Sequence, residues 1–220
     1  DLVKLAYFAD IAKGITSASS VPETLQMVQR SIGTIFAPRN WSILLTDSKS
    51  GGLRFQTVAG EGSEKLTGQL IPAGRGIAGW IAANALPVIV EDVARDERFD
   101  PSMDKRIGFT TKSIIGVPLL NRGKLFGVIE LINKLDGSAF SPLELKILVT
   151  IADFAAIAIE KAYYTAALKR IAVTDPLTEV LNRRGLERAL DREIARCKRK
   201  ELPISILMFD IDNFKGINDT

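Results

Sequence analysis

The spacing of apolar residues changes along the chain and predicts helices first and strands afterwards. Over residues 1–36 apolar side chains recur at helical spacing in two stretches, and Ser20 with Glu23 three positions later supplies a helix start between them. From Trp41 the period becomes two over 41–46 and 53–58, which is typical of half-buried strands. The pattern therefore predicts two helices that precede a β-sheet.

Two further apolar stretches predict a hairpin. They cover 113–120 and 124–133, and the residues between them include an asparagine and a glycine that tolerate positive φ. A shorter apolar run over 88–91 adds another strand. Because these strands form an antiparallel set bracketed by helices, the expected fold class is α+β.

A long helix is expected over about 142–173. It should end before Asp175-Pro176, because proline disfavours helical backbone in the residue that precedes it. Apolar residues in its first half recur at steps of four and three, at Ile147, Ile151, Phe154 and Ala158. Since the usual helix has about 11 to 12 residues, we expect the first half to pack on the sheet and the second half to extend beyond it. The second half is weakly apolar, which fits either a coiled-coil seam or a simple surface helix.

Composition narrows the possible chemistry. The chain contains 46% hydrophobic and 25% charged residues, as globular proteins do, and its net charge of +3 is too small to indicate a nucleic-acid partner. The chain has no histidine, which excludes histidine-activated nucleophiles and the usual zinc sites and leaves phosphoryl chemistry on hard metal ions. One cysteine, Cys197, cannot form an intrachain disulfide, so it fits a reducing compartment.

Localisation follows from what the sequence lacks. No apolar run approaches the ~20 residues that cross a bilayer, and the first residues do not have the features of a signal peptide. We therefore expect a cytoplasmic protein that has no membrane segment in this part of the chain. We also expect both ends of the sequence to lie within longer structural units. The basic run 198–200 lacks stacking aromatic residues, so a solvated helix face fits it better than an RNA site.

Three glycines at 74, 76 and 79 match the spacing of a dinucleotide-binding loop. However, the preceding segment 67–71 is short and polar, where that loop needs a buried strand. The following helix, about 77–85, is also too short to cross a sheet in a βαβ unit. The context therefore argues against an NAD-binding fold.

Four segments in order resemble the GAF family, at 72–80, 87–93, 113–119 and 127–134. The resemblance implies an antiparallel sheet with helices on one side and a cavity on the other, which binds small molecules in many members. We expect residues 1–160 to form the GAF domain, 161–174 to form a signalling-helix linker and 175–220 to begin a second domain.

The predicted pocket carries a partial likeness to cyclic-nucleotide-binding GAF domains. Asn133-Lys134, followed by Phe140 and Glu144, resembles part of their signature, so a cyclic nucleotide is a candidate for the otherwise unknown ligand. In the alternative interpretation, Lys134 and Glu144 cap a hairpin and a helix. The charged loop 95–111 would form a lid. The pocket residues expected from these considerations are Arg98, Phe99, Phe109, Ser113, Asn133 and Lys134, although each also fits a solvated or core position.

The end of the chain resembles a different family. Residues 175–184 are similar to the opening motif of GGDEF domains, and a helix over about 184–200 should follow. The apolar segment 204–211 predicts a buried strand that delivers Asp210 and Asp212 at its carboxyl end. Carboxylates two positions apart in a strand point the same way and can approach a divalent cation.

Residues 209–219 resemble the GGDEF family's metal- and nucleotide-binding segment, which implies a diguanylate cyclase. The resemblance implies that Mg²⁺ is held by Asp210 and the Ile211 carbonyl, that Phe214 and Lys215 lie near the GTP triphosphate, and that Asn218 reads the guanine edge. Magnesium would neutralise phosphate charge during attack on a second GTP. Because each domain binds one GTP, a homodimer is implied.

The printed sequence stops before the family's Gly-Gly-Asp/Glu-Glu-Phe turn, so we expect no catalysis from this chain by itself. The expected function is that of the sensory region of a bacterial diguanylate cyclase, in which a ligand-binding GAF domain controls cyclic di-GMP synthesis from two GTP. The alternative is a GAF ligand-binding or dimerisation module joined to an inactive GGDEF domain. Whether the parent protein is an active enzyme stays open.

Overall fold

The structure is a computed structural model that describes the backbone of residues 2–213 and the side chains from residue 10 onward. The chain divides into two compact units, of which the first ends at Thr165 and the second begins at Ala166. None of the helices within residues 2–213 is long and apolar enough to cross a membrane.

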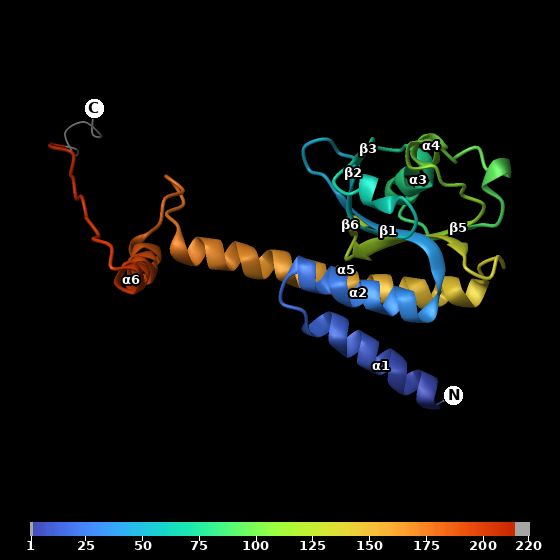
Figure 1. The fold of residues 1–220 in the computed structure, drawn as a ribbon, viewed down its shortest axis with the longest axis horizontal. Coiled ribbons are helices and arrows are strands. Elements are labelled where there is room, and N and C mark those ends of the chain that lie inside the picture. The colour runs from blue at the N-terminus through green and yellow to red at the C-terminus, as the bar shows by residue number, and fades with distance from the viewer. Residues whose placement is uncertain (1, 214–220) are drawn as a thin grey trace. The chain divides into compact units, whose positions relative to one another are not determined.

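An antiparallel sheet of six strands forms the centre of the first unit, in the order β3-β2-β1-β6-β5-β4 (Figure 1). The strands are β1 (Pro38–Thr46), β2 (Leu53–Ala59), β3 (Leu70–Ile71), β4 (Val88–Val90), β5 (Ile114–Asn121) and β6 (Lys124–Lys134). The five strands predicted between residues 41 and 133 are confirmed, and β3 adds a short edge. At the β5–β6 turn, Arg122 and Gly123 adopt positive φ. The α+β fold class is therefore confirmed.

Three helices cover one face of the sheet or each other: α1 (Leu2–Ser17), α2 (Val21–Ile35) and α5 (Pro142–Val173). The main apolar core lies between α2, the first part of α5 and the sheet, where Ile32, Ile129 and Ile151 are almost fully buried. The predicted cap of α2 is confirmed, because the Ser20 side chain accepts a hydrogen bond from the Glu23 N–H. Burial of this apolar surface is what holds the helices on the sheet.

Shorter elements cover the opposite face: α3 (Gly76–Asn84), α4 (Ser102–Ile107) and the 3-10 helices η1 (Ser63–Lys65) and η2 (Val93–Arg95). Alternation in β1 explains this arrangement, since Ile43 packs with the long helices and Leu44 packs with the cluster around α3. Gly116 in β5 permits the approach of α3, because a Cβ atom there would lie 2.4 Å from the Ile81 side chain. A second, smaller core therefore lies on this face.

The second unit begins within the last turns of α5, which ends at Val173 as predicted. The Asp175 carboxylate accepts hydrogen bonds from the Leu177 and Thr178 N–H groups and shapes the turn that follows. Asn182 then caps α6 (Arg183–Lys200) by accepting from the Gly185 N–H. Gly185 admits no side chain, since a Cβ atom there would lie 2.1 Å from the Val173 carbonyl oxygen.

The buried strand predicted over 204–211 is not formed. This stretch has no regular secondary structure, and Leu207, Met208 and Phe209 are 84% to 90% exposed. A strand needs a neighbour to satisfy its backbone N–H and C=O groups, and no strand among residues 2–213 pairs with this segment. The apolar pattern therefore marks a segment that is able to form a strand, but it supplies no partner.

Candidate small-molecule cavity

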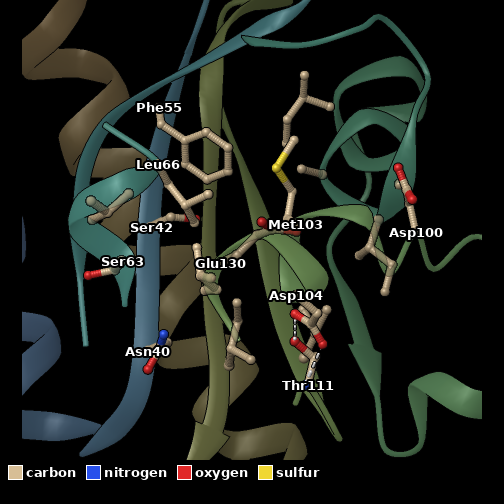
Figure 2. Close-up of a pocket in the computed structure, with 18 of the residues that line it drawn as sticks. Asn40, Ser42, Phe55, Ser63, Leu66, Asp100, Met103, Asp104, Thr111 and Glu130 are labelled. Atoms are coloured by element: carbon tan, nitrogen blue, oxygen red, sulfur yellow. Dashed lines mark hydrogen bonds between the residues drawn. The ribbon is translucent and has the colours of Figure 1, made fainter. Parts of the chain in front are cut away.

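A cavity of about 260 Å³ lies between the sheet and the elements that cover its α3 face (Figure 2). Strands β1, β2 and β6 supply one wall, and α3, α4 and η1 with their flanking loops supply the rest. Most of the lining is apolar, including Phe55, Leu66, Ile77, Met103 and Ile132. A largely apolar cavity with a few polar groups is typical of a small-molecule site.

Two polar side chains point into this space from neighbouring strands (Figure 2). Glu130 in β6 lies opposite Ser42 in β1, and their residues are 7% and 4% exposed. The Ser42 Oγ atom has no hydrogen-bond partner among the described residues, and its contact with Glu130 does not meet hydrogen-bond geometry. Burial raises the pKa of Glu130 to about 7, and the neighbouring Ser42 hydroxyl opposes only part of that rise.

The other polar side chains of the wall already have partners. The Asn40 amide bonds the backbone N–H and C=O of Glu61, at 3.0 and 2.9 Å. Asp104 accepts hydrogen bonds from the N–H and hydroxyl groups of Thr111, at 2.6 and 2.7 Å. Arg75 forms an ion pair with Asp100. Within the described lining, the Ser42 hydroxyl is therefore the buried polar group that lacks a partner, and the Glu130 carboxyl lies beside it.

The loop 95–111 lies along one side of the cavity and is fastened to α3 at two places. One is the ion pair between Arg75 and Asp100, whose pKa is raised by burial but lowered further by hydrogen bonds from Ser102 and Arg75. At the second place, the Arg98 guanidinium lies 4.4 Å from the centre of the Trp80 ring. The loop is therefore positioned as the predicted lid would be.

Comparison with known families agrees with this geometry. Residues 20–159 match the family model described as GAF domain. The chain belongs to the GAF family. Residues 172–220 match the model described as diguanylate cyclase, GGDEF domain, so the beginning of a GGDEF region follows the GAF domain.

Similar proteins include cyclic-nucleotide phosphodiesterases. A probable 3′,5′-cyclic phosphodiesterase, pde-5, of Caenorhabditis elegans is 41% identical over 63 residues, which are 29% of this chain and 9% of that protein. A dual 3′,5′-cyclic-AMP and -GMP phosphodiesterase 11A of Takifugu rubripes is 35% identical over 115 residues, which are 51% of this chain and 13% of that protein. The chain thus spans only a small part of these relatives.

A solved structure supports the fold. The GAF domain of a phosphoenolpyruvate-protein phosphotransferase from Coxiella burnetii superimposes with a TM-score of 0.66 at 19% identity. The match covers 74% of this chain and 96% of that domain. At this identity the likeness establishes a shared architecture.

The structure brings two of the predicted pocket residues of the GAF domain to the cavity, namely Phe99 and Phe109. Arg98 instead stacks on Trp80 and pairs with Asp96 at 2.6 Å, and the hydrogen bond from Arg98 keeps the pKa of Asp96 below its usual range. Ser113 is buried at the start of the β5 region, outside the cavity lining.

Asn133 and Lys134 are engaged in contacts that shape the fold. The Asn133 carboxamide accepts hydrogen bonds from the Lys112 and Ser113 N–H groups and donates to the Thr110 carbonyl. Lys134 pairs with Glu144 at 3.0 Å. Neither residue lines the cavity, so their role as ligand contacts stays a prediction.

Sequence reasoning missed Glu130 and Ser42. The sequence offers a partial signal, because both are polar residues in the middle of largely apolar strands, but their burial is visible only in the folded structure. Polar groups at such positions are usually paired, so an unpaired one is informative.

The predicted metal ligands lie in the second unit, within the irregular stretch that follows α6. Asp210 and Ile211 are exposed, and the Asp210 carboxylate accepts a hydrogen bond from the Ile211 N–H. Their oxygen donors suit Mg²⁺ in kind, but among residues 2–213 no group of three acidic or other ligating side chains gathers around them. The predicted nucleotide contacts Phe214, Lys215 and Asn218 lie outside the described residues.

Proposed function

We propose that the GAF domain is a sensor that binds a small molecule in the cavity under α3 and α4. The observation that carries this proposal is the buried carboxyl of Glu130 beside the unpartnered hydroxyl of Ser42, on the wall of a largely apolar cavity. A buried polar group without a partner costs about 1–3 kcal/mol. A ligand that bonds both groups recovers this cost and buries its own apolar surface, which gives it preferential affinity for the folded domain.

The proposed output is a GGDEF domain that makes cyclic di-GMP from two GTP. The GGDEF match and the order of the two regions support this proposal. We propose the boundaries 1–160 for the GAF domain, 161–174 for the helical linker and 175–220 for the GGDEF region. Asp210 and the Ile211 carbonyl would hold Mg²⁺, Phe214 and Lys215 would contact the triphosphate, and Asn218 would contact guanine. Because two GTP-loaded domains must meet, the proposed working state is a cytoplasmic homodimer.

Contacts within the GAF domain support a route from the cavity to α5. Strand β6 carries Glu130 in the cavity wall and Phe126 near its start, and the Phe126 ring stacks on Tyr163 of α5 with centroids 6.2 Å apart. At the tip of the same hairpin, the Asn121 amide donates to the Glu160 carboxylate at 2.6 Å. A ligand that shifts β6 would therefore act directly on the helix that leads to the GGDEF region.

The alternative function is a GAF ligand-binding or dimerisation module with an inactive GGDEF domain. The two are separated by assaying cyclic di-GMP formation from GTP and Mg²⁺ in protein extended through a complete GGDEF domain. We expect turnover that is lost in the Asp210→Asn variant. Absence of product from the extended protein, with folding intact by circular dichroism, would favour the alternative.

Ligand binding is tested by thermal shift and calorimetry with a panel of metabolites, beginning with cAMP and cGMP because of the relatives' activities. A ligand at 100 times its Kd stabilises the folded state by about 2.7 kcal/mol. Val58→Phe, which fills the cavity, should abolish the shift, whereas Leu135→Phe on the exposed surface should preserve it. Uniformly flat responses of the unmodified protein would instead favour a ligand-free scaffold.

A further inference from the structure

We propose that the cavity selects a small organic cation, with one protonated amine, amidine or guanidine head placed against Glu130 and Ser42 and an apolar body in the remaining space. The inference rests on the proposed sensor function and names its ligand class. It follows from the charge, hydrogen-bonding capacity and size of the cavity.

The charged residues of the lining are predominantly acidic. They are Glu130, Asp100, Asp104 and a single base, Arg75. Arg75 is already paired with Asp100, and its side chain is 55% exposed at the rim. An anionic ligand would therefore find no unpaired basic side chain in the described lining and would meet like charge at Glu130. A cationic ligand would instead meet an oppositely charged carboxylate at Glu130.

The hydrogen-bonding capacity of the inner wall matches a head with several N–H groups. The Glu130 carboxylate can accept two parallel hydrogen bonds, and the Ser42 oxygen beside it can accept another. Amidinium and guanidinium groups present two parallel donors, and an ammonium presents three divergent ones. The pKa of Glu130 is about 7, so about half of these carboxyl groups are ionised at neutral pH without a ligand. A neighbouring positive charge would therefore be enough to keep the carboxylate ionised.

The size of the space limits the body of the ligand. A volume of about 260 Å³ lies just below the range of about 300–1,000 Å³ that is usual for ligand pockets, so the cavity suits a small ligand. Phe55, Leu66 and Met103 surround this volume with apolar surface (Figure 2). A single ring or a short branched chain attached to the cationic head therefore fits, whereas a polycation would place a second charge against apolar walls.

The test uses three ligands with the same ring and different charge: benzamidine, benzamide and benzoate. Calorimetry at pH 8 should give the smallest Kd for benzamidine, at least tenfold weaker binding of benzamide, and no detectable binding of benzoate.

Benzamidine keeps its charge between pH 6 and 8. If ionised Glu130 is its partner, its affinity should rise about tenfold across this range, as the ionised fraction of a group with a pKa of about 7 does. The other charged groups that face the cavity are Arg75, Asp100 and Asp104.

Two variants locate the effect. Glu130→Gln should weaken benzamidine at least tenfold at pH 8 and remove its pH dependence, whereas Glu91→Gln, which changes an exposed acid outside the cavity, should do neither. Retention of the folded state is checked by the melting curve of each variant.

Several outcomes would overturn the inference. Benzamide or benzoate binding as tightly as benzamidine, or an affinity that Glu130→Gln leaves unchanged, would exclude a cation against Glu130. Binding of cAMP or cGMP in the cavity without binding of benzamidine would refute cation selectivity and leave the sensor function intact. If no probe and no metabolite of the panel binds, both proposals fail together.

Discussion

At the scale of the residue, Glu130 makes the ligand-free GAF domain sensitive to pH. Burial raises its pKa from 4.5 to about 7, so the folded state holds a proton that the unfolded chain releases between these values. The stabilisation that this bound proton provides is therefore fully present below pH 4.5 and is lost as the pH rises through about 7. At about 1.36 kcal/mol for each pH unit, the loss approaches about 3 kcal/mol at pH 8.

The Glu130→Gln variant tests this linkage, because glutamine has a similar shape and no charge. We expect its unfolding free energy in urea to equal that of the unmodified protein near pH 4.5 and to exceed it by up to about 3 kcal/mol at pH 8. Glu91→Gln, at an exposed position, should reproduce the unmodified pH profile. Parallel profiles for the unmodified protein and Glu130→Gln would mean that Glu130 has an ionic partner or is solvated.

The residues of the cavity were only partly predictable from sequence. Phe99 and Phe109 were predicted to lie in the pocket because they belong to the charged loop expected to form a lid, and both line the cavity. Glu130 was not identified, because its chemistry depends on what encloses it. A glutamate in an apolar strand is ordinary if it faces solvent and costly if it faces a closed space, and that distinction arises only when α3 and the lid fold over the sheet.

At the scale of the element, the start of α5 is fixed by a capping box. The Ser141 hydroxyl accepts from the Glu144 N–H, and the Glu144 carboxylate accepts from the Ser141 N–H and hydroxyl. Burial raises the pKa of Glu144, but hydrogen bonds from Ser141 and Lys134 outweigh it and bring the pKa below its ordinary value. The stabilisation is therefore present above pH 4.5 and lost as pH falls through the folded pKa.

Substitutions at Glu144 separate the cap from the ion pair with Lys134. Glu144→Ala removes both and should lower the unfolding free energy by about 1–2 kcal/mol at pH 7, measured in urea. Glu144→Gln retains a side chain able to close the capping box, so its loss should stay below about 1 kcal/mol. Equal losses in the two variants would assign the stabilisation to the ion pair instead.

Elements with local causes were the ones that the sequence predicted well. The β5–β6 hairpin and the helix start at Ser20 depend on residues within a few positions of one another, and both are present. The strand expected over 204–211 depends on a distant partner, and its apolar side chains remain exposed. An alternating or apolar pattern thus indicates that a segment is able to form a strand. The backbone hydrogen bonds of that strand require a neighbouring strand.

At the scale of the whole molecule, α5 belongs to both units and is the covalent path between them. Its first half is buried in the GAF core, whereas Tyr164, Leu168 and Ile171 in its second half are 61% to 68% exposed. These three side chains recur at steps of four and three, which places them along one stripe of the helix. The coiled-coil seam, rather than a simple surface helix, therefore stays a prediction for this half of α5.

A second copy of the same stripe would complete a two-stranded coiled coil and bring two GGDEF regions together, as the proposed reaction requires. We expect the chain to be a dimer by light scattering and the double substitution Leu168→Glu with Ile171→Glu to make it monomeric, because four buried carboxylates would face one another across the seam. Lys169→Glu, which changes an exposed position beside the stripe, should leave the dimer intact. A monomeric unmodified chain, or a dimer that survives the double substitution, would exclude the second half of α5 as the dimer contact, and control of the GGDEF domain would then need a different path.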